Sequence, residues 1–309
     1  MKKYLITGVN GFVGRYFVEC LLKHEPDADI LGVDITENTS IESIRYQKLD
    51  LCDAPKVDDL LERENSDYIV HLAAMSSVAQ SWQEPAKCFL NNTSAFLNLA
   101  ESVRLKALKT RILSVGSSEE YGIYNEPMQE IFNLHPKSPY SVARLSQEYL
   151  SKLYVDRFGT DIVMTRSFNH IGPRQSDRFV IPSFIKQLVA ISQGAENKIL
   201  VGNIEVIRDF TDVRDVVEAY YLILQKGKMR EVYNVCSGQG RKLREIIETT
   251  AKLLNIEPNI FVDEARVRPN DMPRVVGDNT KLKTQLGWQQ KYSLTQTLQD
   301  IIEYWKNNS

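Results

Sequence analysis

Residues 1–16 read MKKYLITGVNGFVGRY, and this stretch decides the fold that the rest of the sequence supports. The apolar run Tyr4–Ile6 predicts a buried strand, and Phe12 and Val13 begin a helical pattern. Three glycines lie between them at the spacing G-x-x-G-x-x-G: Gly8, Gly11 and Gly14. Glycine allows a tight turn and a close approach of pyrophosphate to the backbone, while the free N–H groups of the helix face the phosphates. We therefore expect a dinucleotide-binding turn, contacted by the cofactor at Gly8, Gly11, Phe12 and Val13, with an ordinary glycine turn as the alternative.

The acidic partner of such a turn is Asp34, which ends a second apolar run at Ile30–Val33, twenty residues after Gly14. A carboxylate at this place accepts hydrogen bonds from the adenosine ribose and repels a 2′-phosphate. Asp34 therefore favours NAD(H) as the cofactor, while NADP(H) remains possible. The alternative is an aspartate that only ends the strand.

Strand and helix patterns alternate through the first half of the chain. Strands are expected at 44–49, 68–74 and 111–115, and helices at 57–63 and 85–104. This alternation predicts an α/β fold, a doubly wound parallel sheet of the Rossmann type, in which ligands lie beyond the carboxyl ends of the strands. Further cofactor contacts are expected at or near these ends, at Asp50, Leu51, Leu72, Ala73 and Ala74, and at Asn92 in the middle of the helix at 85–104. Two alternatives stay open, since Asp50 also suits a surface loop and Asn92 also suits a polar partner inside the protein.

Composition narrows the class of protein. The 309 residues include 43% hydrophobic and 25% charged residues, as in ordinary soluble globular proteins. A balance of 38 basic against 40 acidic residues argues against a nucleic-acid surface. No apolar run approaches the ~20 residues of a membrane span, and we expect a cytoplasmic protein without a membrane partner. The four scattered cysteines are expected to be free buried thiols, and no histidine spacing indicates a metal site.

Two segments around the middle of the chain carry candidate chemistry. Residues 116–122, GSSEEYG, follow the strand at 111–115 and therefore lie where ligands bind. Residues 138–158 predict a long helix, with Ser138 as its N-cap and a proline in its first turn. The spacing of four residues puts Tyr140 and Arg144 on the same face of this helix.

These motifs resemble the extended short-chain dehydrogenases/reductases that modify nucleotide sugars. The resemblance rests on T-G-x-x-G-x-x-G at 7–14, H-L-A-A at 71–74, S-S-E-E-Y-G at 117–122 and S-P-Y-x-x-x-R at 138–144. It continues through RSFNHIGP at 166–173, RDFTDV at 208–213 and LGW at 286–288, so it covers nearly the whole chain. The sequence is most similar to GDP-4-keto-6-deoxymannose reductases, and next to GDP-mannose 4,6-dehydratases.

The resemblance implies catalytic roles for four residues. Tyr140 would protonate the alkoxide that forms at C4 of the sugar, and Ser117 would hydrogen-bond the same oxygen. Glu119 occupies the position of the base in 4,6-dehydration; in a reductase it would bind a sugar hydroxyl or remain a solvated loop residue. Substrate contacts are implied or expected at Ser76, Ser118, Asn169, Arg174, Arg208 and Arg268, where the planar arginine group suits phosphate oxygens.

Arg144 departs from the family motif, which has a lysine at this position. The lysine holds the nicotinamide ribose and favours the phenolate of the tyrosine through its charge. Arginine keeps the charge, but it is larger and does not release a proton. We therefore expect a working enzyme without a proton relay through residue 144, and expect Arg144→Lys to leave or raise its turnover.

The resulting hypothesis is a nucleotide-sugar oxidoreductase that reduces the C4 ketone of a GDP-4-keto-6-deoxyhexose with NAD(P)H. The alternatives are a GDP-mannose 4,6-dehydratase with bound NAD, a C4 epimerase or C4 oxidase of a related nucleotide sugar, and a non-enzymatic NAD-binding protein. We expect a Rossmann domain at 1–167 and a smaller mixed α/β substrate domain at 168–309, from which some segments, at about 203–235, return to the first. The resemblance also implies a homodimer, formed by the helices that contain Asn92 and Tyr140.

Overall fold

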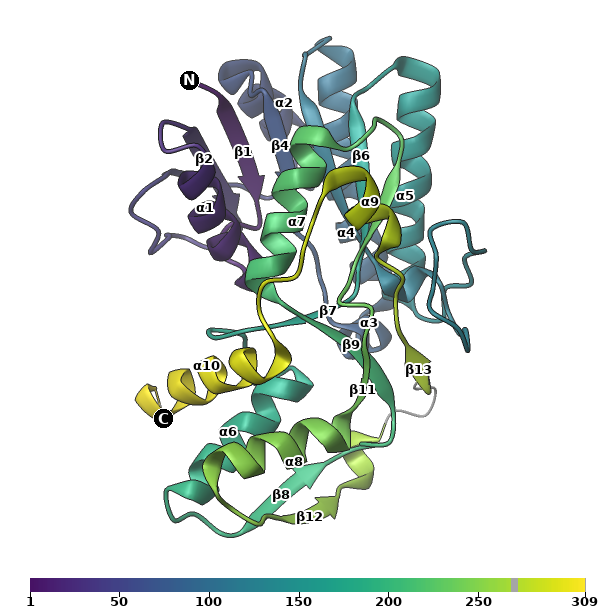
Figure 1. The fold of residues 1–309 in the computed structure, drawn as a ribbon. Coiled ribbons are helices and arrows are strands. Elements are labelled where there is room, and N and C mark those ends of the chain that lie inside the picture. The colour runs from purple at the N-terminus through teal and green to yellow at the C-terminus, as the bar shows by residue number, and fades with distance from the viewer. Residues whose placement is uncertain (268–271, 309) are drawn as a thin grey trace.

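The computed structural model describes residues 1–267 and 272–308 and is built around a seven-stranded sheet (Figure 1). All neighbouring strands of this sheet pair in parallel. In spatial order they are β10 (Val232–Val235), β6 (Ile162–Ser167), β5 (Arg111–Ser117), β4 (Tyr68–His71), β1 (Lys3–Thr7), β2 (Asp29–Asp34) and β3 (Arg45–Lys48). The order reverses at β1 and β4, which is the switch point where doubly wound sheets bind their ligands.

Helices cover both faces of the sheet, as Figure 1 shows. One face packs against α1 (Phe12–His24), α7 (Val213–Lys226) and α9 (Thr280–Leu286). The other packs against α2 (Ala54–Glu64), α4 (Pro85–Leu105) and α5 (Pro139–Phe158). Each layer buries its own apolar cluster, so the strands are apolar on both sides, as the near-continuous runs in the sequence predict.

A smaller lobe is formed by the second half of the chain. β9 (Ile207–Asp212) pairs with β7 (Asn169–Ile171), β11 (Gly240–Lys242) and β13 (Arg274–Val275), while β8 (Lys198–Val201) pairs with β12 (Asn259–Val262). Around them lie α6 (Val180–Ser192), α8 (Leu243–Leu254) and α10 (Leu294–Asn307), which share a separate apolar cluster. The remaining short elements are α3 (Val78–Gln83), η1 (Ser118–Glu120) and η2 (Glu264–Arg266).

The predicted fold class is confirmed, with local differences at the ends of elements and in the first helical layer. β4 ends at His71 rather than at Ala74, because the N–H groups of Leu72 and Ala73 bond the Thr7 hydroxyl and leave the sheet ladder. α9 also packs in the first helical layer, where Leu286 and the following Trp288 are buried. This helix lies outside the segment at about 203–235 that was predicted to return to the larger domain.

No helix among the described residues is long and apolar enough to cross a membrane.

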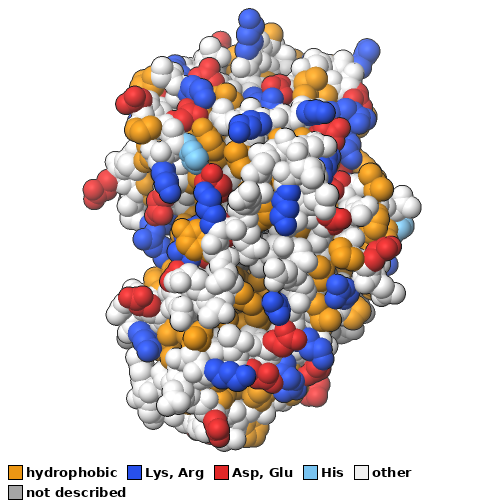
Figure 2. All heavy atoms as spheres, viewed as in Figure 1, with side chains coloured by type: hydrophobic (Ala, Val, Ile, Leu, Met, Phe, Trp, Pro, Cys, Tyr) orange, Lys and Arg blue, Asp and Glu red, His pale blue; other side chains and the backbone are white. Residues whose placement is uncertain are grey.

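The surface charges agree with the balanced composition, whereas one of the four cysteines departs from the expectation. Figure 2 shows basic and acidic side chains interspersed over the face it presents, without a large region of one sign. All four cysteines are free; Cys52 is exposed, contrary to the expectation of four buried thiols, because it lies in a surface turn after Leu51.

Candidate active site

The glycine turn after β1 is pressed against the loop that follows β4. Gly8 has φ +68°, and a Cβ at this position would lie 2.8 Å from the Cα atom of Ala73. The Thr7 hydroxyl oxygen accepts the N–H groups of Leu72 and Ala73, each at 3.2 Å. The glycine is therefore required for both its conformation and the contact, and the predicted residues Gly8, Leu72 and Ala73 lie together.

The first turn of α1 suits an anionic ligand. Gly11 precedes the helix and provides no side-chain cap. The residues of the first turn, all of which the structure describes, include no acidic side chain. Its N–H groups and positive dipole end are thus available for phosphate. At the end of β2, the Asp34 carboxylate accepts the backbone N–H groups of Asn10 at 3.2 Å and Thr36 at 3.3 Å, which fixes it beside the same turn. Together these residues fit a dinucleotide cofactor.

The helix start at Ser138 positions Tyr140 and Arg144. The Ser138 hydroxyl accepts the N–H of Ser141 at 3.1 Å, and Pro139 occupies the first turn. Arg144 donates from Nε to the Tyr140 hydroxyl at 3.3 Å and from Nη1 to the carbonyl of Val115 at 3.0 Å. Since Val115 lies two residues before Ser117, this guanidinium links the phenol to the strand that carries the predicted catalytic serine.

Gln147 is a site residue that the sequence analysis missed. Its side-chain oxygen accepts the Arg144 Nη1 at 2.7 Å, and its amide nitrogen donates to the Ser114 hydroxyl at 2.9 Å. Both Arg144 and Gln147 are buried. The signal was available, because Gln147 lies three residues after Arg144 and therefore on the same side of the helix.

His71 is a second residue whose role was missed. The Thr7 hydroxyl already accepts two N–H groups, so its own proton goes to His71 Nδ1, at 3.0 Å, and the ring proton lies on Nε2. Nε2 is buried and has no hydrogen-bond partner among the described residues. Burial, helped by the charge of Arg144, lowers the pKa of His71 to about 3. The site therefore contains a neutral imidazole beside the guanidinium.

The loop with Ser117 and Glu119 is ordered by its own short helix. The Ser117 hydroxyl oxygen accepts the N–H of Glu119 at 3.2 Å, and α5 packs against η1. Ser117 and Ser118 are buried, whereas Glu119 is half-buried. The three predicted residues thus lie at the carboxyl end of β5, where a ligand of this sheet is expected.

Two further predicted cofactor residues support loops. Asn92 bonds both backbone groups of Met75, accepting its N–H at 2.8 Å and donating to its carbonyl at 3.1 Å. This polar partner, one of the two alternatives for Asn92, holds the loop after β4 in place. Asp50 is exposed and accepts the N–H of Cys52, while Leu51 is buried in the core.

The predicted substrate residues come from several elements. Arg174 is exposed, has φ +67° and forms an ion pair with Glu19 at 2.9 Å. Asn169 begins β7 and pairs with Phe210 of β9, and Arg208 lies two residues before Phe210 on the same strand. Ser76 is exposed in the loop after β4, and Arg268 lies outside the described residues.

One group of potential metal ligands was not anticipated. Cys20, His24 and Glu218 approach one another between α1 and α7. The His24 Nε2 already contacts the Glu218 carboxylate at 3.1 Å, and Lys291 Nζ lies 3.9 Å from it. Glu218 is thus already paired with His24 and lies near the positive charge of Lys291.

The strand order, the glycine turn and the tyrosine–arginine helix define the class of protein: an NAD(P)-dependent short-chain dehydrogenase/reductase of the extended type. More narrowly, a family model described as GDP-mannose 4,6 dehydratase matches residues 5–301, and the chain belongs to this family. The predicted family resemblance is thereby confirmed.

Individual relatives include both reductases and dehydratases. The chain is 33% identical to GDP-6-deoxy-D-mannose reductase of Pseudomonas aeruginosa, over 99% of this chain and 98% of that protein. It is 26% identical to GDP-mannose 4,6-dehydratase of Vibrio cholerae, over 97% of this chain and 92% of that protein. A solved structure of RMD from Pseudomonas aeruginosa complexed with NADPH has a TM-score of 0.89, with 32% identity and all of both chains covered.

Proposed function

We propose that this protein reduces the C4 ketone of a GDP-4-keto-6-deoxyhexose with a nicotinamide cofactor. The observation that carries the proposal is the bond from Arg144 to Tyr140, made next to the strand that leads to Ser117. The similarity to a GDP-6-deoxy-D-mannose reductase over nearly the whole of both chains supports the choice of reaction and of substrate class.

In this reaction the protein supplies the proton and stabilises the charge that develops on the C4 oxygen. When bound, NAD(P)H would supply a hydride for the C4 carbon and become NAD(P)⁺, and this hydride together with one proton converts the ketone into an alcohol. Tyr140 transfers its hydroxyl proton to the C4 oxygen as charge develops there, and Ser117 donates a hydrogen bond to the same oxygen. The Arg144 guanidinium, fixed by Val115 and Gln147, stabilises the phenolate that remains.

A 4,6-dehydratase is the second candidate, and Glu119 is the observation that favours it. This carboxylate lies two residues after Ser117 on η1, where it would remove the C5 proton of a 4-keto intermediate. A dehydratase among the relatives supports this reading. A C4 epimerase or C4 oxidase of a related nucleotide sugar ranks below these two candidates.

NADH is the cofactor that Asp34 favours, because its carboxylate lies where the adenosine ribose binds in this fold. A related structure holds NADPH, so the preference has to be measured for this chain.

The proposed assembly is a cytoplasmic homodimer with α4 and α5 at the interface. These helices pack together and expose Phe89, Leu90, Val142 and Leu153, which would cover one another across a two-fold axis. Three buried free thiols fit a reducing compartment. We also propose the division at residue 167, with α7 and β10, from within the predicted segment 203–235, returning to the larger domain, whereas β9 stays in the smaller lobe.

Product analysis distinguishes the candidates. With a GDP-4-keto-6-deoxyhexose, a reductase consumes one NAD(P)H for each sugar reduced; with GDP-mannose, a dehydratase releases water without net cofactor change. Tyr140→Phe is expected to lower turnover by about 10²–10⁴-fold while cofactor binding persists. Wild-type turnover in this variant would contradict the proposal.

A further inference from the structure

A buried carboxyl group lies directly behind the loop with the predicted catalytic serine. Glu120 ends η1 and is fully buried. Its Oε1 accepts the backbone N–H of Ser117 at 2.7 Å. A Cβ on Gly116 would lie 2.6 Å from this oxygen, so the strand end is shaped to admit the carboxyl group.

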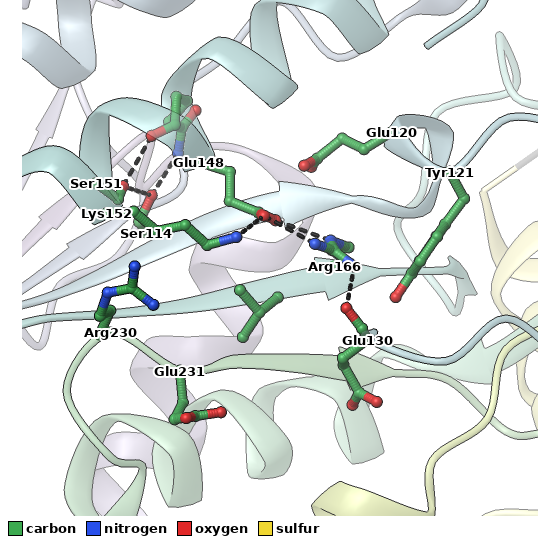
Figure 3. A network of polar contacts seen from close by, with 12 residues as sticks. Ser114, Glu120, Tyr121, Glu130, Glu148, Ser151, Lys152, Arg166, Arg230 and Glu231 are labelled. Atoms are coloured by element: carbon green, nitrogen blue, oxygen red, sulfur yellow. Dashed lines mark hydrogen bonds and ion pairs between the residues drawn. The ribbon is translucent and has the colours of Figure 1, made fainter. Parts of the chain in front are cut away.

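The charges around Glu120 come from neighbouring α5 and β6. Glu148 pairs with the Arg166 guanidinium through two hydrogen bonds of 2.8 Å and with Lys152 at 2.7 Å (Figure 3). Arg166 also lies over the Tyr121 ring, with 4.6 Å between its Cζ and the ring centroid. The guanidinium is thus committed to Glu148, and Figure 3 shows the carboxyl group of Glu120 directed toward this pair.

The second oxygen of Glu120 has no hydrogen-bond donor among the described residues. Oε2 is buried and unpartnered, which would be costly for an ionised carboxylate. Burial and the neighbouring charge of Glu148 raise the pKa of Glu120 well above its usual range. Although burial opposes it, the bonds from Arg166 lower the pKa of Glu148. Glu120 is therefore the protonated member, and Glu148 the ionised one.

We propose that Glu120 is a positioning residue, which holds the Ser117 amide through one oxygen while the proton on its other oxygen is shared with Glu148. A carboxylic acid does this better than a carboxylate, because it offers one acceptor and one donor. The position of the serine hydroxyl is thereby tied to the buried pair of Glu148 and Arg166. This inference rests on the proposed function, in which Ser117 contacts the C4 oxygen.

Three variants test the inference, each assayed as full-length protein with GDP-4-keto-6-deoxymannose and NAD(P)H. The rate is divided by the concentration of protein that binds the cofactor, so that unfolded protein does not lower the apparent kcat. Glu120→Leu removes the acceptor and is expected to lower kcat about 10-fold or more, with the KM for the cofactor unchanged. Glu120→Gln keeps one acceptor and one donor and is expected to retain kcat within about threefold. Glu130→Leu is the matched control, because Glu130 accepts the N–H of Asn234 instead; it is expected to lower stability but not kcat.

A double-mutant cycle with Ser117→Ala shows whether Glu120 acts through the serine. If it does, adding Glu120→Leu to Ser117→Ala changes kcat by less than about threefold. Full kcat in Glu120→Leu, an equal loss in Glu120→Gln, or additive losses in the double variant would each overturn the inference. Failure of the proposed function is recognised separately, because the wild type would then consume no NAD(P)H with this substrate. A wild-type rate in Ser117→Ala would show that Ser117 does not assist the reaction.

Discussion

Arg144→Lys separates the charge of the guanidinium from its hydrogen bonds. An extended lysine places its ammonium near the position of the arginine Cζ, one bond beyond the Nε that contacts the Tyr140 hydroxyl at 3.3 Å and one bond short of Nη1. The Val115 carbonyl and the Gln147 side-chain oxygen thus lose their hydrogen bonds from Arg144 Nη1. The Val115 carbonyl still accepts the Gln147 amide at 3.2 Å. The Gln147 oxygen alone is left unpaired in a buried site, at a cost of about 1–3 kcal/mol in the free energy of unfolding.

The expected result is a less stable protein whose turnover is unchanged or higher, because the charge beside the phenol remains. Urea unfolding and steady-state kinetics on the same preparation measure the two effects. Arg144→Met is the matched control: it keeps most of the volume, removes the charge and is expected to lower turnover by about 10²-fold or more. A loss in Arg144→Lys as large as in Arg144→Met would refute this reasoning, and would show that the site needs the guanidinium itself.

Three other predictions concern cofactor choice, pH and assembly. Asp34→Ala is expected to shift the ratio of kcat/KM for NADPH to that for NADH about 10-fold toward NADPH, because a repulsive charge is removed; an unchanged ratio would exclude Asp34 as the determinant. His71 has a pKa of about 3 in the folded protein against 6.5 unfolded, so its stabilising effect is complete above pH 6.5 and lost as the pH falls toward 3. The wild type should lose about 2 kcal/mol between pH 8 and pH 5 relative to His71→Asn, measured by urea unfolding, and parallel pH curves would contradict this. Leu153→Lys, on the exposed face of α5, is expected to give monomers by analytical ultracentrifugation, whereas a monomeric wild type would contradict the proposed dimer.

The sequence was informative where a local pattern determines local structure. The glycine spacing, the strand end at Asp34 and the helix cap at Ser138 each depend on residues close in sequence, and the structure has them where predicted. His71 and Glu120 were not assigned roles, because their states depend on burial and on charges supplied by other elements. Arg144, for example, is 73 residues from His71, and no periodicity reports such a neighbour.

The position of β10 has a consequence for biosynthesis. The strand that completes the large sheet is residues 232–235, and α7, which covers Leu113 and Val115, ends only at Lys226. When only the first 167 residues have folded, β6 is an edge strand, and the face of the sheet that α7 would cover is covered by α1 alone. More than sixty further residues must be synthesised before β10 completes the sheet, and during this interval the nascent chain is a substrate for chaperones. A fragment truncated at residue 167 is therefore expected to aggregate.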